Sequence, residues 1–108
     1  MVGGSQAFEF LYCQLVLDRL QFDMNAKIEF NPSAFKHGVT ETDIRFAIDK
    51  FLYEDPLEDY YNKYLLLGFD TKGTLLEVMY NYIDADTINV FHAMPCRRNF
   101  YYLLERKR

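Results

Sequence analysis

The stretch KYLLLGFDTKGTLLEVMYNYIDADTINVFHAMPCRR, residues 63–98, decides the fold. It contains three runs of apolar and aromatic residues, at 63–69, 74–83 and 87–93, and aromatic side chains favour strands. Two short turn sequences separate the runs: Asp-Thr-Lys-Gly, in which Gly73 can adopt a positive φ, and Asp-Ala-Asp at 84–86. Because each connection is only long enough for a hairpin, the sequence predicts three consecutive antiparallel strands.

The side chains of a strand point alternately to its two sides, so each run can be divided into two faces. One face of the second run carries Leu76, Val78, Tyr80 and Tyr82, and the other carries Leu75, Glu77, Met79 and Asn81. In the third run Ile88, Val90 and His92 share one face, and Asn89 and Phe91 share the other. This pattern favours core positions for the two tyrosines over stacking on bases. It favours an exposed carboxylate for Glu77 over a catalytic base.

Residues 40–53 predict a helix ahead of the three strands. Thr40 can cap its free amides, and Asp43, three residues later, completes a capping box. Five apolar residues at helical spacing are expected to be buried against the sheet: Ile44, Ala47, Ile48, Phe51 and Leu52. A short strand at 27–30 precedes the helix and is broken by Pro32, which lacks a backbone donor.

The remaining segments complete the predicted order. Residues 54–59 read as a solvated acidic loop, and Pro95 is expected to start a final helix that docks through Phe100, Leu103 and Leu104. The resulting order is β-α-β-β-β-α, with hairpin connections and a segregated helix. It predicts the α+β class, as a small antiparallel sheet with a helix packed on one face.

The chain has 108 residues and 50% apolar composition, which suits one domain with its own core. Residues 1–23 differ in pattern from the rest and are interpreted either as an extra helix or as a start-site artefact, with residues 24–108 as the functional domain. There is no basic signal-peptide start and no transmembrane run, so a cytoplasmic location without membrane contact is expected. Cys13 and Cys96 share no metal-binding spacing, so reduced, buried thiols and neither metal nor cofactor are expected.

The net charge of −4 hides an uneven distribution. Residues 96–108 contain five basic side chains against Glu105 alone, whereas the rest of the chain is acidic. Broad electrostatic binding of nucleic acid needs many phosphate contacts. We therefore expect any contact with nucleic acid to be local and to involve the basic end.

Several of these segments together resemble the BrnT-type toxins. The loop Lys-His-Gly-Val at 36–39, followed by a capped helix, is similar to a signature near the start of that family. The blocks at 64–68, 73–80 and 88–93 are similar to the family's strand motifs, in the same order. The likeness covers roughly residues 24–98. The chain departs from the family where Ser-Ala-Arg becomes His92-Ala93-Met94, where Lys63 replaces an arginine, and in its acidic balance.

The resemblance implies a RelE/barnase-like ribonuclease fold and the toxin half of a bacterial toxin–antitoxin pair. Its implied partners are a cognate antitoxin, usually a small ribbon-helix-helix DNA-binding protein, and an RNA substrate. Contact with DNA is implied only through the antitoxin. The rival interpretation is a non-catalytic protein-interaction domain on the same fold.

Metal-independent RNA cleavage needs a base for the 2′-hydroxyl, a cation for the phosphate and an acid for the leaving oxygen. Imidazoles exchange protons near neutral pH, and arginines can fork onto phosphate oxygens. Each candidate also has a structural interpretation, as a strand-end, loop or solvated helix residue. The candidate catalytic residues are His92, Arg97, Arg98, Lys63 and His37.

Overall fold

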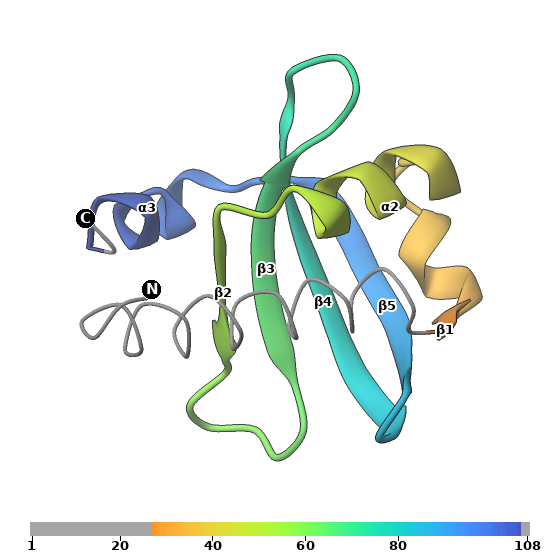
Figure 1. The fold of residues 1–108 in the computed structure, drawn as a ribbon. Coiled ribbons are helices and arrows are strands. Elements are labelled where there is room, and N and C mark those ends of the chain that lie inside the picture. Colours follow the sequence, from red (N-terminus) through yellow and green to blue (C-terminus); the bar gives the residue numbers. More distant parts are fainter. Residues whose placement is uncertain (1–26, 107–108) are drawn as a thin grey trace, which may run out of the picture.

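The structure is a computed structural model that describes residues 27–106. Its elements are β1 (Lys27–Phe30), the 3-10 turn η1 (Pro32–Phe35), α2 (Glu41–Asp49), β2 (Tyr53–Pro56), β3 (Tyr64–Phe69), β4 (Leu75–Asp84), β5 (Thr87–Pro95), the 3-10 turn η2 (Arg98–Phe100) and α3 (Tyr102–Arg106) (Figure 1). The predicted α+β class is confirmed. The extension at 1–23 and Cys13 lie outside the described residues. No helix within 27–106 is long and apolar enough to cross a membrane.

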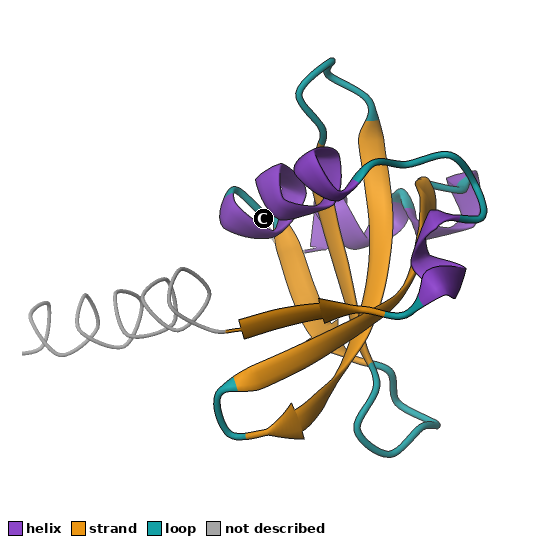
Figure 2. Ribbon diagram, turned by 90° about the vertical axis from the view of Figure 1, so that its right-hand side faces the viewer, coloured by secondary structure: helices purple, strands orange, loops and turns teal. Residues whose placement is uncertain are grey.

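The five strands form one sheet in the order β1-β5-β4-β3-β2, and Figure 2 shows how strongly it twists. Strands β2 to β5 are an antiparallel meander, which includes the three predicted strands. Strand β1, however, pairs in parallel with β5, so the prediction of a wholly antiparallel sheet is wrong. The prediction of an acidic loop at 54–59 is also wrong in its first half. Glu54 and Asp55 belong to β2, where they pair with Leu66 and Leu65 respectively.

Helix α2 begins as predicted and ends earlier. The hydroxyl of Thr40 accepts a hydrogen bond from the backbone N–H of Asp43, so the predicted N-cap is confirmed. The helix ends at Asp49 rather than continuing to residue 53, because the backbone N–H of Leu52 donates to the carbonyl of Leu67 and draws the chain into β2. The Leu52 side chain is consequently 50% exposed, and its predicted burial is wrong.

Two apolar clusters cover the two faces of the sheet. On one face α2 lies across the strands (Figure 1), and Ile44, Ala47 and Ile48 are buried there as predicted. On the other face Leu103 is buried, with Phe100 and Leu104 packed beside it, so the predicted docking of these three residues is confirmed. Their segment nevertheless starts later than predicted, because Pro95 ends β5 and the helix itself begins at Tyr102.

The tyrosines of β4 pack on the α2 face. Tyr80 is buried and stacks on Tyr64, with ring centroids 5.3 Å apart, and Tyr82 meets Tyr64 edge to face. The backbone of Tyr82 is held by Asn62, whose side-chain amide both donates to and accepts from it at 2.9 and 3.0 Å. The favoured interpretation of Tyr80 and Tyr82 as packing residues is therefore confirmed.

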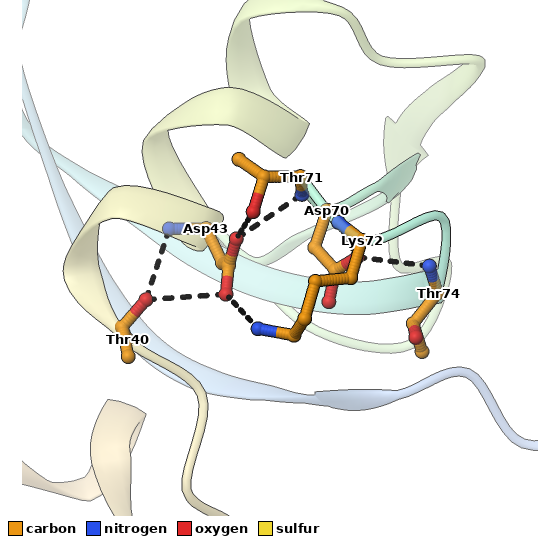
Figure 3. Close-up of polar contacts among 6 residues, drawn as sticks. All are labelled: Thr40, Asp43, Asp70, Thr71, Lys72 and Thr74. Atoms are coloured by element: carbon orange, nitrogen blue, oxygen red, sulfur yellow. Dashed lines mark hydrogen bonds and ion pairs between the residues drawn. The ribbon is translucent and has the colours of Figure 1, made fainter.

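Asp43 ties the start of α2 to the turn between β3 and β4 (Figure 3). Its buried carboxylate accepts hydrogen bonds from the backbone N–H and the hydroxyl of Thr71, at 3.1 and 2.7 Å, and pairs with Lys72. The two bonds from Thr71 lower the pKa of Asp43 to about 2. Within the turn, Asp70 accepts from the backbone of Lys72 and Thr74, which fixes the hairpin. These acidic residues therefore have structural roles.

Gly68 marks the closest approach of α2 to the sheet. A Cβ atom at this position would lie 2.6 Å from the backbone oxygen of Ala47, which cannot move without the helix. We expect Gly68→Ala to lower the free energy of unfolding by about 1–3 kcal/mol, the usual cost of overpacking, measured by chemical denaturation. Gly73→Ala is the comparison, because that site is open and only its φ of +85° opposes a side chain. Unchanged stability of Gly68→Ala would show that α2 can shift.

Candidate functional site

A buried carboxylate, Glu77, lies at the centre of the candidate site. It projects from β4 on the face opposite α2, and its side chain is 0% exposed. Its Oε2 atom accepts from Nε2 of His92 at 2.8 Å and from Nη2 of Arg97 at 2.7 Å. Its Oε1 atom accepts from the backbone N–H of Arg97 at 2.9 Å. The favoured interpretation of Glu77 as an exposed carboxylate is therefore wrong, because side chains cover this face of β4 as well as the face toward α2.

Two opposing effects act on the pKa of Glu77. Desolvation by burial is the largest single effect, and it raises the pKa. The hydrogen bonds from Arg97 and His92, together with the charge of Arg97, lower the pKa by more than burial raises it. The net result is a pKa below the ordinary value for glutamate. Glu77 is thus an ionised acceptor with its oxygens already occupied. It can position and stabilise a neighbouring cation, but it has little capacity to take up a substrate proton.

A β-bulge brings His92 to Glu77. Val90 pairs with Tyr80 and His92 pairs with Met79, so Phe91 is an extra residue in β5. An extra residue shifts the alternation of side chains by one. The prediction that His92 shares a face with Ile88 and Val90 is consequently wrong: His92 lies with Glu77 on the opposite face.

The bond to Glu77 determines which nitrogen of His92 is reactive. An ionised carboxylate only accepts hydrogen bonds, so Nε2 of His92 must carry a proton. In the neutral imidazole Nδ1 is then the basic nitrogen, and protonation there gives an imidazolium paired with Glu77. The side chain is 20% exposed, so solvent or a small group can reach part of the ring. Nδ1 is therefore the nitrogen of His92 that can accept a proton while the bond to Glu77 is kept.

His37 provides a second imidazole. It follows η1 in an exposed loop, and its ring centroid lies 5.7 Å from that of His92, in an edge-to-face arrangement. The loop is anchored beside β5, because the hydroxyl of Ser33 donates to the backbone oxygen of Phe91 at 2.6 Å. Gly38 turns the chain away with a φ of +84°. The structure thus brings together two of the predicted site residues from distant parts of the sequence.

Arg97 and Arg98 have different environments. Arg97 is an extended residue before η2 rather than part of a helical turn, and its guanidinium bonds Glu77 through Nε and Nη2. Its side chain is still 51% exposed, and both N–H bonds of Nη1 have no partner among residues 27–106. Arg98 starts η2 and is exposed. Of the two predicted arginines, Arg97 therefore belongs to the site, and Arg98 lies in the adjoining exposed turn.

Lys63 lies farther along the same side of the sheet. Its Nζ atom is 4.9 Å from the ring centroid of Tyr60 and 5.7 Å from that of Phe91. Phe91 precedes His92, so Lys63 reaches the edge of the site through an intervening ring. Of the five predicted residues, three lie together in the structure, namely His92, His37 and Arg97. Lys63 and Arg98 lie outside this cluster.

Cys96 is next to the site and is chemically quiet. Its thiol is buried, as predicted, and donates to the backbone oxygen of Arg97. Burial, reinforced by the charge of Glu77, raises the pKa of Cys96 to about 11. The thiolate is the nucleophilic form of cysteine, so Cys96 has no role as a nucleophile near neutral pH. Among residues 27–106 there is also no group of three or more His, Cys, Asp or Glu that could hold a metal ion.

Glu77 is the residue that sequence reasoning undervalued. The sequence does contain a signal for it, because the carboxylate stands between Leu75 and Met79 on a face whose other members are largely apolar. A charge in such a position is buried only when it is paired.

The chain matches no family model, and neither a curated protein nor a solved structure matches it significantly.

Proposed function

We propose that this protein is the toxin component of a bacterial toxin–antitoxin pair and acts as a metal-independent endoribonuclease with a RelE/barnase-like fold. Its activity is held in check by a cognate antitoxin, a small ribbon-helix-helix DNA-binding protein. The observation that carries the proposal is the fixed orientation of His92 by buried Glu77, beside a second imidazole and a half-exposed guanidinium. The motif resemblance at 36–39 and along the strands supplies the toxin assignment.

The geometry supports a two-histidine mechanism. Nδ1 of His92 removes the proton from the ribose 2′-hydroxyl, whose oxygen attacks the adjacent phosphorus, and Glu77 stabilises the imidazolium that forms. His37, protonated at the start, gives its proton to the departing 5′-oxygen. The open N–H groups of Arg97 stabilise the extra negative charge on the phosphate oxygens. The products are a 2′,3′-cyclic phosphate and a 5′-hydroxyl end.

A cleavage assay tests this proposal directly. The purified chain, incubated with single-stranded RNA in excess EDTA, should give fragments with 2′,3′-cyclic phosphate and 5′-hydroxyl ends. Expression in bacteria should arrest growth, and co-expression of the antitoxin encoded beside it should restore growth. Intact RNA together with normal growth would refute the ribonuclease.

One observation favours the non-catalytic alternative. A hollow of about 600 Å³ lies between β2 and α3, and its lining includes Tyr53, Asp55, Glu58, Phe100 and Leu103. Near it, Tyr61 is 96% exposed. A hollow that combines aromatic rings with carboxylates, beside an exposed tyrosine, can contact the surface of a partner protein. Binding of the antitoxin without any RNA cleavage would favour this interpretation.

A further inference from the structure

Among residues 27–106, side chains cover the sheet face opposite α2 at one end only. Toward β2 it is closed by Leu103 and Phe100. Toward the β4–β5 turn it has an open hollow of about 390 Å³, whose lining is Tyr61, Asn62, Lys63, Asn81, Asn89 and Phe91. This hollow, here called the amide hollow, adjoins His92 because Phe91 precedes it in the bulge.

Two asparagines form the floor of the amide hollow. Asn81 and Asn89 are directly opposed on β4 and β5, and Nδ2 of Asn89 donates to Oδ1 of Asn81 at 3.1 Å. This bond holds both amides in place on the sheet. It leaves Oδ1 of Asn89 and the second N–H of its amide with no partner among residues 27–106. Fixed donors and acceptors side by side are what the edge of a nucleobase requires.

A ring and a cation form the wall. The bulge that re-aims His92 also leaves Phe91 on the side of the hollow, and the Phe91 ring is partly exposed. Lys63 has its ammonium group 5.7 Å from that ring. An aromatic face can stack on a base, and a neighbouring cation can contact the phosphate attached to the same nucleotide. Phe91 is therefore placed between a base-sized space and the proposed reaction centre.

We propose that the amide hollow binds one unstacked nucleobase of single-stranded RNA, next to the phosphate that is held at His92. Asn81 and Asn89 contact the edge of the base, Phe91 contacts its face, and Lys63 contacts a neighbouring phosphate. The choice of ligand rests on the proposed function. The consequence is that the chain cuts RNA with a base preference set at Asn89.

Binding measurements in EDTA test this without requiring catalysis. The probes are the four nucleoside 3′-monophosphates and ribose 5-phosphate, titrated into the full chain by calorimetry and by NMR. At least one nucleotide should bind about tenfold or more tightly than ribose 5-phosphate, as expected for one stacked base. Phe91→Leu should remove most of that difference, and Asn89→Ala should make the affinities of the four nucleotides similar. Asn99→Ala, which changes an exposed asparagine in η2, should alter neither result. Equal binding of all five probes would overturn the proposal.

Cleavage measurements separate this inference from the proposed function. With RNA oligonucleotides that differ at one base, Asn89→Ala and Phe91→Leu should level the cleavage rates, and melting curves show whether each variant is folded. One outcome would overturn the inference while the ribonuclease stands: wild type cleaves RNA with no base preference and binds the nucleotides no more tightly than ribose 5-phosphate. Base binding without any cleavage would overturn the ribonuclease while the inference stands.

Discussion

Arg97→Ala should lower the free energy of unfolding by about 2–4 kcal/mol. The substitution removes the principal partner of Glu77, a fully buried carboxylate, and breaking a buried pair costs about 3–5 kcal/mol. We expect a value toward the lower side, because His92 and the backbone N–H of Arg97 remain as donors to the carboxylate. Urea unfolding of the purified variant at neutral pH measures the loss.

Arg98→Ala is the matched control, since it removes an exposed arginine from the next position and should change stability by less than about 0.5 kcal/mol. The double substitution Arg97→Ala with Glu77→Gln should cost less than the two single effects added together, because the uncompensated charge is gone. Equal, small effects of Arg97→Ala and Arg98→Ala would mean that Glu77 does not depend on its guanidinium partner.

The loss caused by Arg97→Ala should depend on pH. In wild type the lowered pKa of Glu77 means that its ionised form stabilises the fold above about pH 4.5, and this contribution is lost as the pH falls through the lowered value. In the variant the hydrogen bonds and the charge of the Arg97 side chain are gone, so the pKa of Glu77 rises above its wild-type value. The destabilisation of the variant relative to wild type is therefore largest near neutral pH and becomes smaller on acidification. The curves of unfolding free energy against pH for the two proteins should converge below about pH 4.5.

His92→Gln should reduce RNA cleavage by about 10²–10⁴-fold, the range that a proton-transferring side chain contributes. Glutamine can still donate an N–H to Glu77, but it cannot accept and release a proton at neutral pH. The melting temperature should therefore stay close to that of wild type. The rate is measured on a fluorescent RNA oligonucleotide under single-turnover conditions.

His37→Gln should have an effect of comparable size, because the mechanism needs both an acid and a base. Lys36→Gln is its control: it alters the neighbouring exposed residue of the same loop and should leave the rate nearly unchanged. If His92→Gln is folded and cleaves at the wild-type rate, proton transfer by His92 is excluded and the two-histidine mechanism fails.

Features that depend on a few neighbouring residues could be predicted from the sequence. The cap at Thr40 and the turn at 70–73 are local hydrogen-bond patterns, and the structure has both. The faces of β4 follow from simple alternation, and they also agree. Strand β2 could not be found in this way, because its acidic sequence is extended only through pairing with β3.

The site could be predicted only in part, for a related reason. The residue types of His92 and Arg97 were apparent, but the arrangement that joins them depends on the extra residue Phe91. Nothing in the alternation of apolar and polar residues along β5 marks that position as a bulge. The role of Glu77 also required knowledge of what covers the second face of β4, which is set by Leu103 and Phe100 near the end of the chain.

The parallel pairing of β1 with β5 has a consequence during protein synthesis. Lys27 and Thr87 are partners although most of the described chain lies between them, so β1 has no strand to join until β5 has left the ribosome. The loop with His37 depends on the same event, because its anchor at Ser33 is the backbone of Phe91. Domains fold as units, and non-local pairings form late. A nascent chain can therefore place His37 beside His92 only after β5 has been synthesised and has joined β1.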